Sequence, residues 1–269
     1  MRNLMIKAIF FDIDGTLVSM KTRKITDTVI EALHKAQKNG IKLFISSGRP
    51  PMQLSLLDDS FNAFPWDGYV MFNGQCCMGA DREPFYEKTM PVEALEKLVP
   101  WLKETADFCC TFHEKTYSYD LKFNQRTYNY LSSIGKTERM TPIDDPVRAL
   151  THPTYMICPY IPEEMDAEFV AHAPGLKSAR WTPDFADIIP ADGGKDVGIQ
   201  KMLDRFGISR EESMAFGDGG NDITMLEYAA IGVAMGNANE RVKSHADYIT
   251  DECEQDGIVT ALKHFKLID

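Results

Sequence analysis

Strand-like and helix-like segments alternate at both ends of the chain, and this alternation constrains the fold more than any other feature. The first strand-like run is β-branched and aromatic, Lys7–Phe11, and a segment with apolar residues at helical spacing follows it over 26–40. Strands that alternate with helices form a parallel sheet with helices on both faces. The pattern therefore predicts an α/β core with a Rossmann-like, doubly wound parallel sheet. Its other predicted elements are strands at 41–46, 69–72, 213–216 and 231–235, and helices at 198–207, 223–230 and 257–265.

The middle of the chain has a different pattern. Short runs rich in β-branched and aromatic residues, such as "FCCTFHE" and "TYMICPYI", surround two helical segments, "VEALEKLVPWLKET" and "EEMDAEFVAHA". This pattern is typical of an α+β unit with an antiparallel sheet. We therefore predict two domains. Residues 1–83 and 190–269 form the α/β core, and residues 84–189 form an inserted α+β cap.

Composition excludes several classes of protein. The formal net charge of -11 over 269 residues argues against nucleic-acid binding, because nucleic-acid binders normally carry a basic face. No apolar run approaches the ~20 residues needed to span a bilayer. The six cysteines form no C-x-x-C pair and no zinc-ligand spacing. We therefore expect a cytoplasmic protein with buried, reduced thiols, a monomer or weak homo-oligomer that binds neither nucleic acid nor a membrane.

Four polar motifs follow predicted strands or lie just beyond them. In a doubly wound sheet the ligand crevice lies at the carboxyl edge of the strands, so motifs far apart in sequence are expected to meet there. The motifs are "DIDGT" (Asp12–Thr16), "SSGRP" (Ser46–Pro50), "GGKD" (Gly193–Asp196) and "GDGGND" (Gly217–Asp222).

Four carboxylates would share that edge: Asp12, Asp14, Asp218 and Asp222. Two like charges about 4 Å apart repel by roughly 4 kcal/mol at an effective dielectric near 20, so the group needs a counter-ion. Mg²⁺ suits it, since this hard cation takes carboxylate oxygens and waters. With the charge of Lys195 added, and one carboxyl protonated as a general acid, a phosphate dianion could approach a neutral site.

The other motif residues suit a phosphate group. Ser47 offers a hydroxyl donor, and the amides around Gly48 can point toward an anion. Lys195 can neutralise a transferring phosphoryl group. Of the two acids in "DIDGT", one can attack phosphorus as a carboxylate, and the other can donate a proton to the leaving oxygen and later activate water.

Competing motifs do not match. "GDGGND" departs from G-x-G-x-x-G at Asp222, and "GGKD" lacks the Ser or Thr that follows the lysine of a Walker A loop. A calcium loop that began at "DIDGT" would have Arg23 where it needs a closing glutamate.

Taken in order, the four motifs resemble those of the haloacid dehalogenase (HAD) superfamily. More narrowly, the chain resembles the Cof-type, subfamily IIB phosphatases, such as bacterial sugar phosphatases, which carry a large α+β cap between the second and third motifs. The resemblance covers the whole chain in architecture. It implies a Mg²⁺-dependent phosphatase that hydrolyses a small phosphorylated metabolite, with a sugar phosphate favoured, through an aspartyl-phosphate.

The resemblance also implies a role for each motif residue. Asp12 would be the nucleophile, and Asp14 the general acid and base. Asp12, Asp218 and the backbone carbonyl of Asp14 would hold the metal, with Asp222 behind them and out of contact with it. Four residues would bind or position the phosphate: Ser47, Gly48, Lys195 and Asn221.

Several assignments stay open. Arg49 can contact substrate or pin the backbone, and Asn73 in "FNGQ" can face the substrate or belong to a turn. His113, Arg180 and Trp181 of the insert can contact the leaving group, although polar residues there are more often solvated surface. Two alternative functions also remain. One is a phosphomutase or other phosphotransferase on the same scaffold, and the other is a phosphometabolite-binding protein without catalysis.

Overall fold

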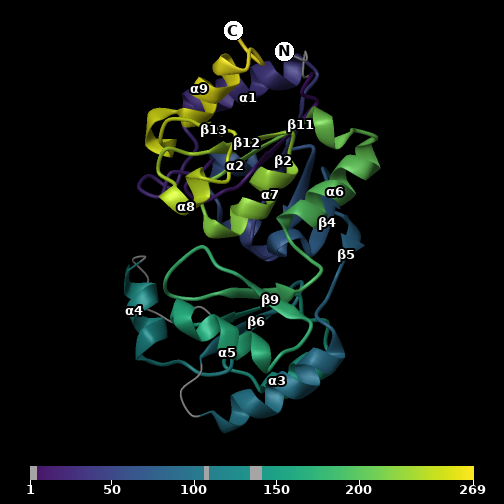
Figure 1. Cartoon of the computed structure of the whole chain (residues 1–269), viewed down its shortest axis with the longest axis vertical. Helices are drawn as coiled ribbons and strands as arrows, with labels where there is room; N and C mark the ends of the chain where they lie inside the picture. The colour runs from purple at the N-terminus through teal and green to yellow at the C-terminus, as the bar shows by residue number, and fades with distance from the viewer. Residues whose placement is uncertain (1–4, 106–108, 134–140) are drawn as a thin grey trace. The chain divides into compact units, whose positions relative to one another are not determined.

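The computed structural model describes residues 5–105, 109–133 and 141–269, which divide into two compact units (Figure 1). The larger unit contains the residues up to Arg49, Gln53–Glu87 and Gly194–Asp269, and the smaller unit contains Pro50–Met52 and Lys88–Gly193. The sequence placed the insert at 84–189. The difference arises because residues 84–87 form an edge strand of the larger unit's sheet, and 190–193 lie with the smaller unit.

An eight-stranded sheet forms the centre of the larger unit, in the order β13-β12-β11-β1-β2-β3-β4-β5. The strands from β13 to β3 run parallel, which confirms the predicted α/β fold. β4 and β5 extend one edge as an antiparallel meander that the sequence pattern did not predict. The strands are β1 (Ala8–Phe11), β2 (Lys42–Ser46), β3 (Gly68–Met71), β4 (Cys76–Gly79), β5 (Pro84–Glu87), β11 (Ser213–Gly217), β12 (Ile231–Ala234) and β13 (Tyr248–Ile249).

Helices pack on this sheet through apolar residues at helical spacing. α6 (Lys195–Phe206) and α7 (Ile223–Tyr228) cover the face that carries Ala8 and Phe10. α1 (Asp27–Lys38) packs against β2 and α9 (Gly257–His264). The shorter helices are α2 (Asp59–Asn62) and α8 (Glu240–Lys243).

Local signals set the helix ends. The side chain of Thr26 caps α1, and Gly207 ends α6 in the left-handed conformation with φ of 63°. Ser209 and Glu212 form a capping box before β11. α6 begins at Lys195 and not at 198, so this lysine belongs to the first turn of a helix.

The smaller unit contains an antiparallel sheet in the order β7-β6-β8-β10-β9, which confirms the predicted α+β insert. One face, with Phe112, Tyr119 and Ile157, packs against Leu98 and Phe169 of the helices. The helix α4 was not predicted. The elements are β6 (Cys110–His113), β7 (Ser118–Asp120), β8 (Met156–Pro159), β9 (Leu176–Ala179), β10 (Asp187–Pro190), α3 (Val92–Glu104), α4 (Gln125–Ser133) and α5 (Asp166–Ala171).

Strand order creates a topological switch point at β1. From β1 the chain continues to β2 and β3 on one side, and β11 leads to β12 and β13 on the other. Ligands of doubly wound sheets bind at the carboxyl ends of the strands at such a point. We therefore expect a ligand-binding site at the residues that follow β1 and β11.

Two predictions from composition can be compared with the structure. All six cysteines are free thiols, and each is buried except the half-buried Cys253. Within the described ranges, no helix is long and apolar enough to cross a membrane.

Candidate active site

The paired strands β1 and β11 bring two aspartates to the same edge of the sheet. Asp12 follows β1 directly, and its backbone N–H donates to the carbonyl of Phe216 at 3.0 Å. Asp218 follows β11, and Gly15 allows it to come close, because a Cβ at Gly15 would lie 2.4 Å from Asp218 Oδ2. Gly15 also has φ of 82°, so both sterics and backbone conformation favour glycine here.

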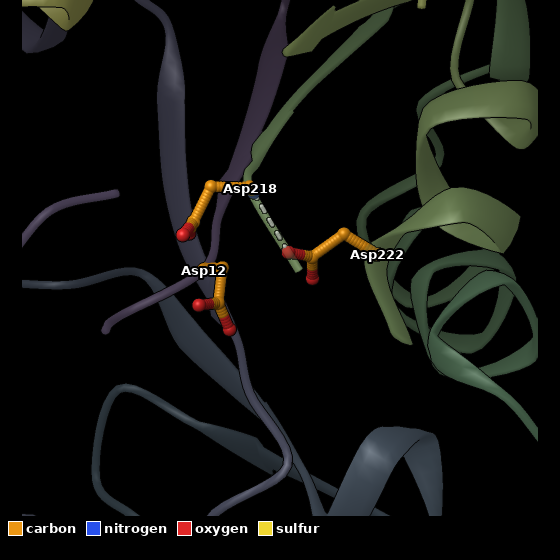
Figure 2. Close-up of side chains that lie close together, drawn as sticks. All are labelled: Asp12, Asp218 and Asp222. Atoms are coloured by element: carbon orange, nitrogen blue, oxygen red, sulfur yellow. Dashed lines mark hydrogen bonds between the residues drawn. The ribbon is translucent and has the colours of Figure 1, made fainter. Parts of the chain in front are cut away.

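Three carboxylates face one another at this edge: Asp12, Asp218 and Asp222 (Figure 2). Each offers an oxygen, and these oxygens all lie within 4.8 Å of one another. The fourth predicted member, Asp14, is not part of this cluster. Hard carboxylate oxygens grouped in this way are the donor set of a divalent cation such as Mg²⁺.

Lys195 supplies positive charge from the other side of the cluster. Its fully buried Nζ donates to Asp12 Oδ1 at 2.7 Å and to Asp222 Oδ1 at 2.5 Å. Burial alone would lower the pKa of this ammonium, but the charges of Asp12 and Asp222 outweigh burial and raise its pKa above the usual value. Lys195 is therefore a permanent cation at neutral pH.

Excess negative charge remains despite this lysine. Burial, with repulsion from Asp222 and Asp14, raises the pKa of Asp12 to about 7 against the opposing effect of Lys195. Burial, and then the charges of Asp12 and Asp222, raise the pKa of Asp218 well above its usual range. Three carboxylates and one ammonium leave two negative charges, which one divalent cation would neutralise. The residues present thus fit the metal ion predicted from the sequence.

Asp222 differs from the other two members of the cluster. Its Oδ2 accepts hydrogen bonds from the backbone N–H groups of Asp218 and Gly219, at 2.9 and 2.8 Å, while Oδ1 accepts from Lys195. Protein donors therefore engage both oxygens of this fully buried carboxylate. Asp222 is also the most buried of the three, since Asp12 is 8% exposed and Asp218 is half-buried, so Asp12 and Asp218 are the carboxylates better able to face a cation.

Asp14 makes a separate ion pair with Arg49. Arg49 Nε donates to Asp14 Oδ2 at 2.6 Å, and Nη2 donates to Oδ1 at 2.7 Å, a bidentate arrangement. The Arg49 fork therefore holds Asp14 outside the three-carboxylate cluster, although Asp14 is close enough for its charge to raise the pKa of Asp12. From the sequence, Arg49 was expected either to contact substrate or to support the backbone. In the structure its side chain contacts an acidic residue of the "DIDGT" motif.

The remaining predicted residues surround the same edge. Ser47 is buried, and its Oγ accepts from the Arg49 backbone N–H at 3.2 Å. Asn221 Nδ2 donates to Asn73 Oδ1 at 2.9 Å. Asn73 is buried, as Ser47 is. The side-chain amides of Asn73 and Asn221 therefore meet in the folded chain although 148 positions separate the two residues in the sequence.

The sequence analysis missed two residues that hold Asp218. Thr16 Oγ1 donates to Asp218 Oδ1 at 2.8 Å, and Asn237 Nδ2 donates to Asp218 Oδ2 at 3.2 Å and to the Gly15 carbonyl at 2.9 Å. Thr16 belongs to the "DIDGT" motif. Asn237 follows the strand predicted at 231–235, so the rule that identified the four motifs also applies to it.

A mainly parallel sheet, a separate antiparallel insert and an aspartate cluster at the β1–β11 switch point define the architecture of a metal-assisted phosphatase. A family profile described as haloacid dehalogenase-like hydrolase matches residues 9–262, and the chain belongs to this family. It is a HAD phosphatase of the Cof-type IIB subclass, a phosphoric monoester hydrolase that acts on a small phosphorylated compound.

Similar proteins agree with this assignment. The HAD subclass IIB sugar phosphatase BT4131 is 37% identical, with a TM-score of 0.88 over 97% of this chain and 100% of that chain. The HAD phosphatase BT1666 of Bacteroides thetaiotaomicron is 33% identical, with a TM-score of 0.90 over 98% and 97% of the two chains. The 5-amino-6-(5-phospho-D-ribitylamino)uracil phosphatase YitU of Bacillus subtilis (strain 168) is 28% identical over 270 residues, 96% of each chain.

Proposed function

We propose that the protein is a Mg²⁺-dependent sugar phosphatase that forms an aspartyl-phosphate on Asp12. The observation that carries this proposal is the contact of Lys195 with Asp12 beside Asp218. Lys195 holds Asp12 by one oxygen, so the carboxylate keeps a fixed orientation toward an incoming phosphorus. The same ammonium adds positive charge where the phosphoryl group is transferred.

The chemistry divides between two carboxyl groups. Asp12 attacks phosphorus while the bond from phosphorus to the leaving oxygen breaks, and the Asp14 carboxyl gives that oxygen its proton. Asp14 then takes a proton from the water that attacks the aspartyl-phosphate, which releases inorganic phosphate and restores Asp12. Bound Mg²⁺ would supply charge neutralisation and orient a phosphate oxygen. Asp12, Asp218 and the Asp14 backbone carbonyl would hold it, and Asp222 would support them without touching it.

Arg49 has a part in this scheme. Since Arg49 holds both carboxylate oxygens of Asp14, that carboxyl must leave the guanidinium before it can serve a leaving group. A substrate phosphate is a good exchange partner, because guanidinium groups bind phosphate and carboxylate with the same fork. Ser47, Gly48 and Asn221 would bind or position the phosphate beside Lys195.

The substrate class rests on the relatives. The 37% identity with a sugar phosphatase favours a sugar phosphate over the phosphoribitylaminouracil that YitU is named for. We assign to the insert the role of a lid that selects the leaving group, and we place the protein in the cytoplasm, in keeping with its free thiols.

The test is Asp12→Asn, assayed for phosphate release in Mg²⁺ across sugar phosphates and the YitU substrate. The amide cannot form an acyl phosphate, so turnover is expected to disappear while the thermal unfolding temperature is kept. A matched control is Asp81→Asn in the exposed turn between β4 and β5, which should leave turnover unchanged. Near-normal rates of phosphate release in Asp12→Asn would refute the assignment of Asp12 as the nucleophile. Product isomerisation without phosphate release would instead identify a phosphomutase.

A further inference from the structure

The turn that follows β3 has an unusual backbone. Phe72, Asn73 and Gly74 have φ of 54°, 52° and 97° in succession, all in the left-handed region. Glycine adopts this conformation readily and asparagine tolerates it, but for an aromatic residue it is a true outlier. Such strain persists only where the surrounding contacts enforce it, and it concentrates at functional sites.

The contacts of this turn reach two of the four motifs through the backbone. The N–H of Asn73 donates to the Ser47 carbonyl at 3.0 Å, and the N–H of Phe72 donates to the Arg49 carbonyl at 3.1 Å. On its other side, Gly74 lies against the residue before Lys195, since a Cβ on Gly74 would lie 1.9 Å from the Gly194 carbonyl oxygen. The turn is therefore packed between the Ser47 loop and the first turn of α6.

The Asn73 side chain reaches a third motif. Its Oδ1 accepts from Asn221 Nδ2 at 2.9 Å, and its exposed fraction is only 1%. An amide group is planar, so fixing the Nδ2 of Asn221 also fixes the direction of its Oδ1. Asn73 thereby determines how Asn221 presents its polar atoms.

We propose that Asn73 is a positioning residue for the phosphate-binding loops, acting through Asn221 and the Ser47 loop and not by contact with substrate. The proposal rests on the proposed function, in which Ser47 and Asn221 bind or position the transferring phosphate. In this proposal the left-handed turn has a structural role at the active site. The turn links loops from three separate parts of the sequence, so that a phosphate meets them in one fixed arrangement.

The primary variant is Asn73→Gly, because glycine accepts the same φ without strain and removes only the amide. With p-nitrophenyl phosphate as substrate, kcat/KM is expected to fall about 10-fold, and Ki for orthovanadate to rise by about the same factor. The Mg²⁺ concentration for half-maximal activity should not change, because the aspartate cluster stays intact. Asn73→Asp keeps the Oδ1 acceptor and should retain more activity than Asn73→Gly.

Two comparisons separate positioning from general damage. Arg82→Gly changes another left-handed residue, with φ of 61° in the β4–β5 turn, and should leave both kinetics and vanadate inhibition unchanged. In an Asn221→Ala background, Asn73→Gly should cost less than about twofold, since the residue through which it acts is already gone.

Wild-type kinetics in Asn73→Gly, or equal losses with and without Asn221, would overturn the positioning role. If Asn73→Gly does not fold, wild-type kinetics and vanadate inhibition in Asn221→Ala would overturn the proposal, because Asn73 is proposed to act through the Asn221 side chain. A wild-type protein that releases no phosphate from any phosphomonoester would instead refute the proposed function itself.

Discussion

Lys195 Nζ lies 2.7 Å from Asp12 Oδ1 although the lysine side chain is completely buried. A buried ammonium is tolerated only with partners, and its removal leaves the carboxylates of Asp12 and Asp222 without compensation. We predict that Lys195→Met lowers the free energy of unfolding by about 3–5 kcal/mol and abolishes phosphatase turnover.

Urea denaturation followed by tryptophan fluorescence measures this loss. Lys201→Met is the matched control in the same helix. Lys201 Nζ lies over the Tyr86 ring, 5.4 Å from its centroid, and this cation–π contact should contribute less than about 1 kcal/mol to stability. Equal stability of the two variants would mean that the buried ion pairs do not hold this part of the sheet together.

Asp14→Asn should separate the two halves of the reaction. The amide can neither protonate a leaving oxygen nor deprotonate water, but Asp12 keeps its contact with Lys195. With p-nitrophenyl phosphate, whose leaving group needs no proton, we expect a burst of p-nitrophenol followed by slow turnover. With an alkyl phosphate the burst should vanish. Stopped-flow absorbance and acid-quench mass spectrometry report the phosphoenzyme, and steady rates like those of wild type on both substrates would exclude Asp14 from proton transfer.

Thr16→Val should weaken metal binding. It removes the hydroxyl that donates to Asp218 Oδ1 at 2.8 Å, and loss of such a support typically costs 10-fold or more in metal affinity, so the Mg²⁺ concentration for half-maximal activity should rise about 10-fold. Thr16→Ser should restore it. Thr260→Val breaks another threonine–aspartate hydrogen bond, with Asp251, and serves as the control that leaves the Mg²⁺ dependence unchanged. Identical Mg²⁺ titrations for Thr16→Val and wild type would count against Asp218 as a metal ligand.

His113 predicts a pH dependence of stability in the insert. Burial lowers the pKa of this histidine to about 4, while its Nδ1 lies 2.8 Å from Ser118 Oγ. Between its unfolded pKa near 6.5 and about 4, the unfolded chain binds a proton that the folded chain does not, so stability falls as the pH is lowered through this window. The contribution is at most about 3 kcal/mol.

The measurement compares unfolding free energies of wild type and His113→Gln between pH 4 and pH 7. The difference between the two curves should grow with pH across the window, because only wild type carries the titrating group. His152→Gln changes an exposed histidine and should follow wild type. Parallel curves for His113→Gln and wild type would show that the histidine has the same pKa in the folded and unfolded states, which would contradict the prediction.

Sequence reasoning succeeded where the fold depends on periodicity and on strand ends. Asp12 and Asp218 meet because each follows a parallel strand, and Lys195 reaches them from the start of a helix that follows the insert. The β4–β5 meander was missed because Arg82 takes the left-handed conformation that glycine or asparagine usually signals. Gly79 and Asp81, whose Oδ1 accepts from the Glu83 N–H at 3.1 Å, are the turn residues that could have indicated it.

Side-chain pairing was the other limit. Nothing in the spacing indicates that Arg49 would take both oxygens of Asp14, or that Asn221 would donate to Asn73. Both contacts depend on rotamers, and the second also depends on a backbone conformation at Phe72 that local propensity disfavours. Such contacts are decided by tertiary packing, and they occur here around the residues that we propose for the chemistry.

The point at which the chain re-enters the larger unit, after Gly193, lies directly before the catalytic lysine proposed here. The smaller unit ends at Gly193, and the buried lysine of the core stands only two positions later. A foreign insert spliced between Lys88 and Gly193 would thus leave the whole aspartate cluster and its lysine in the recipient scaffold. If the insert selects the leaving group as we propose, substrate preference could be exchanged together with it, provided that Gly194 is retained, because its φ of 144° favours glycine and places its carbonyl against Gly74.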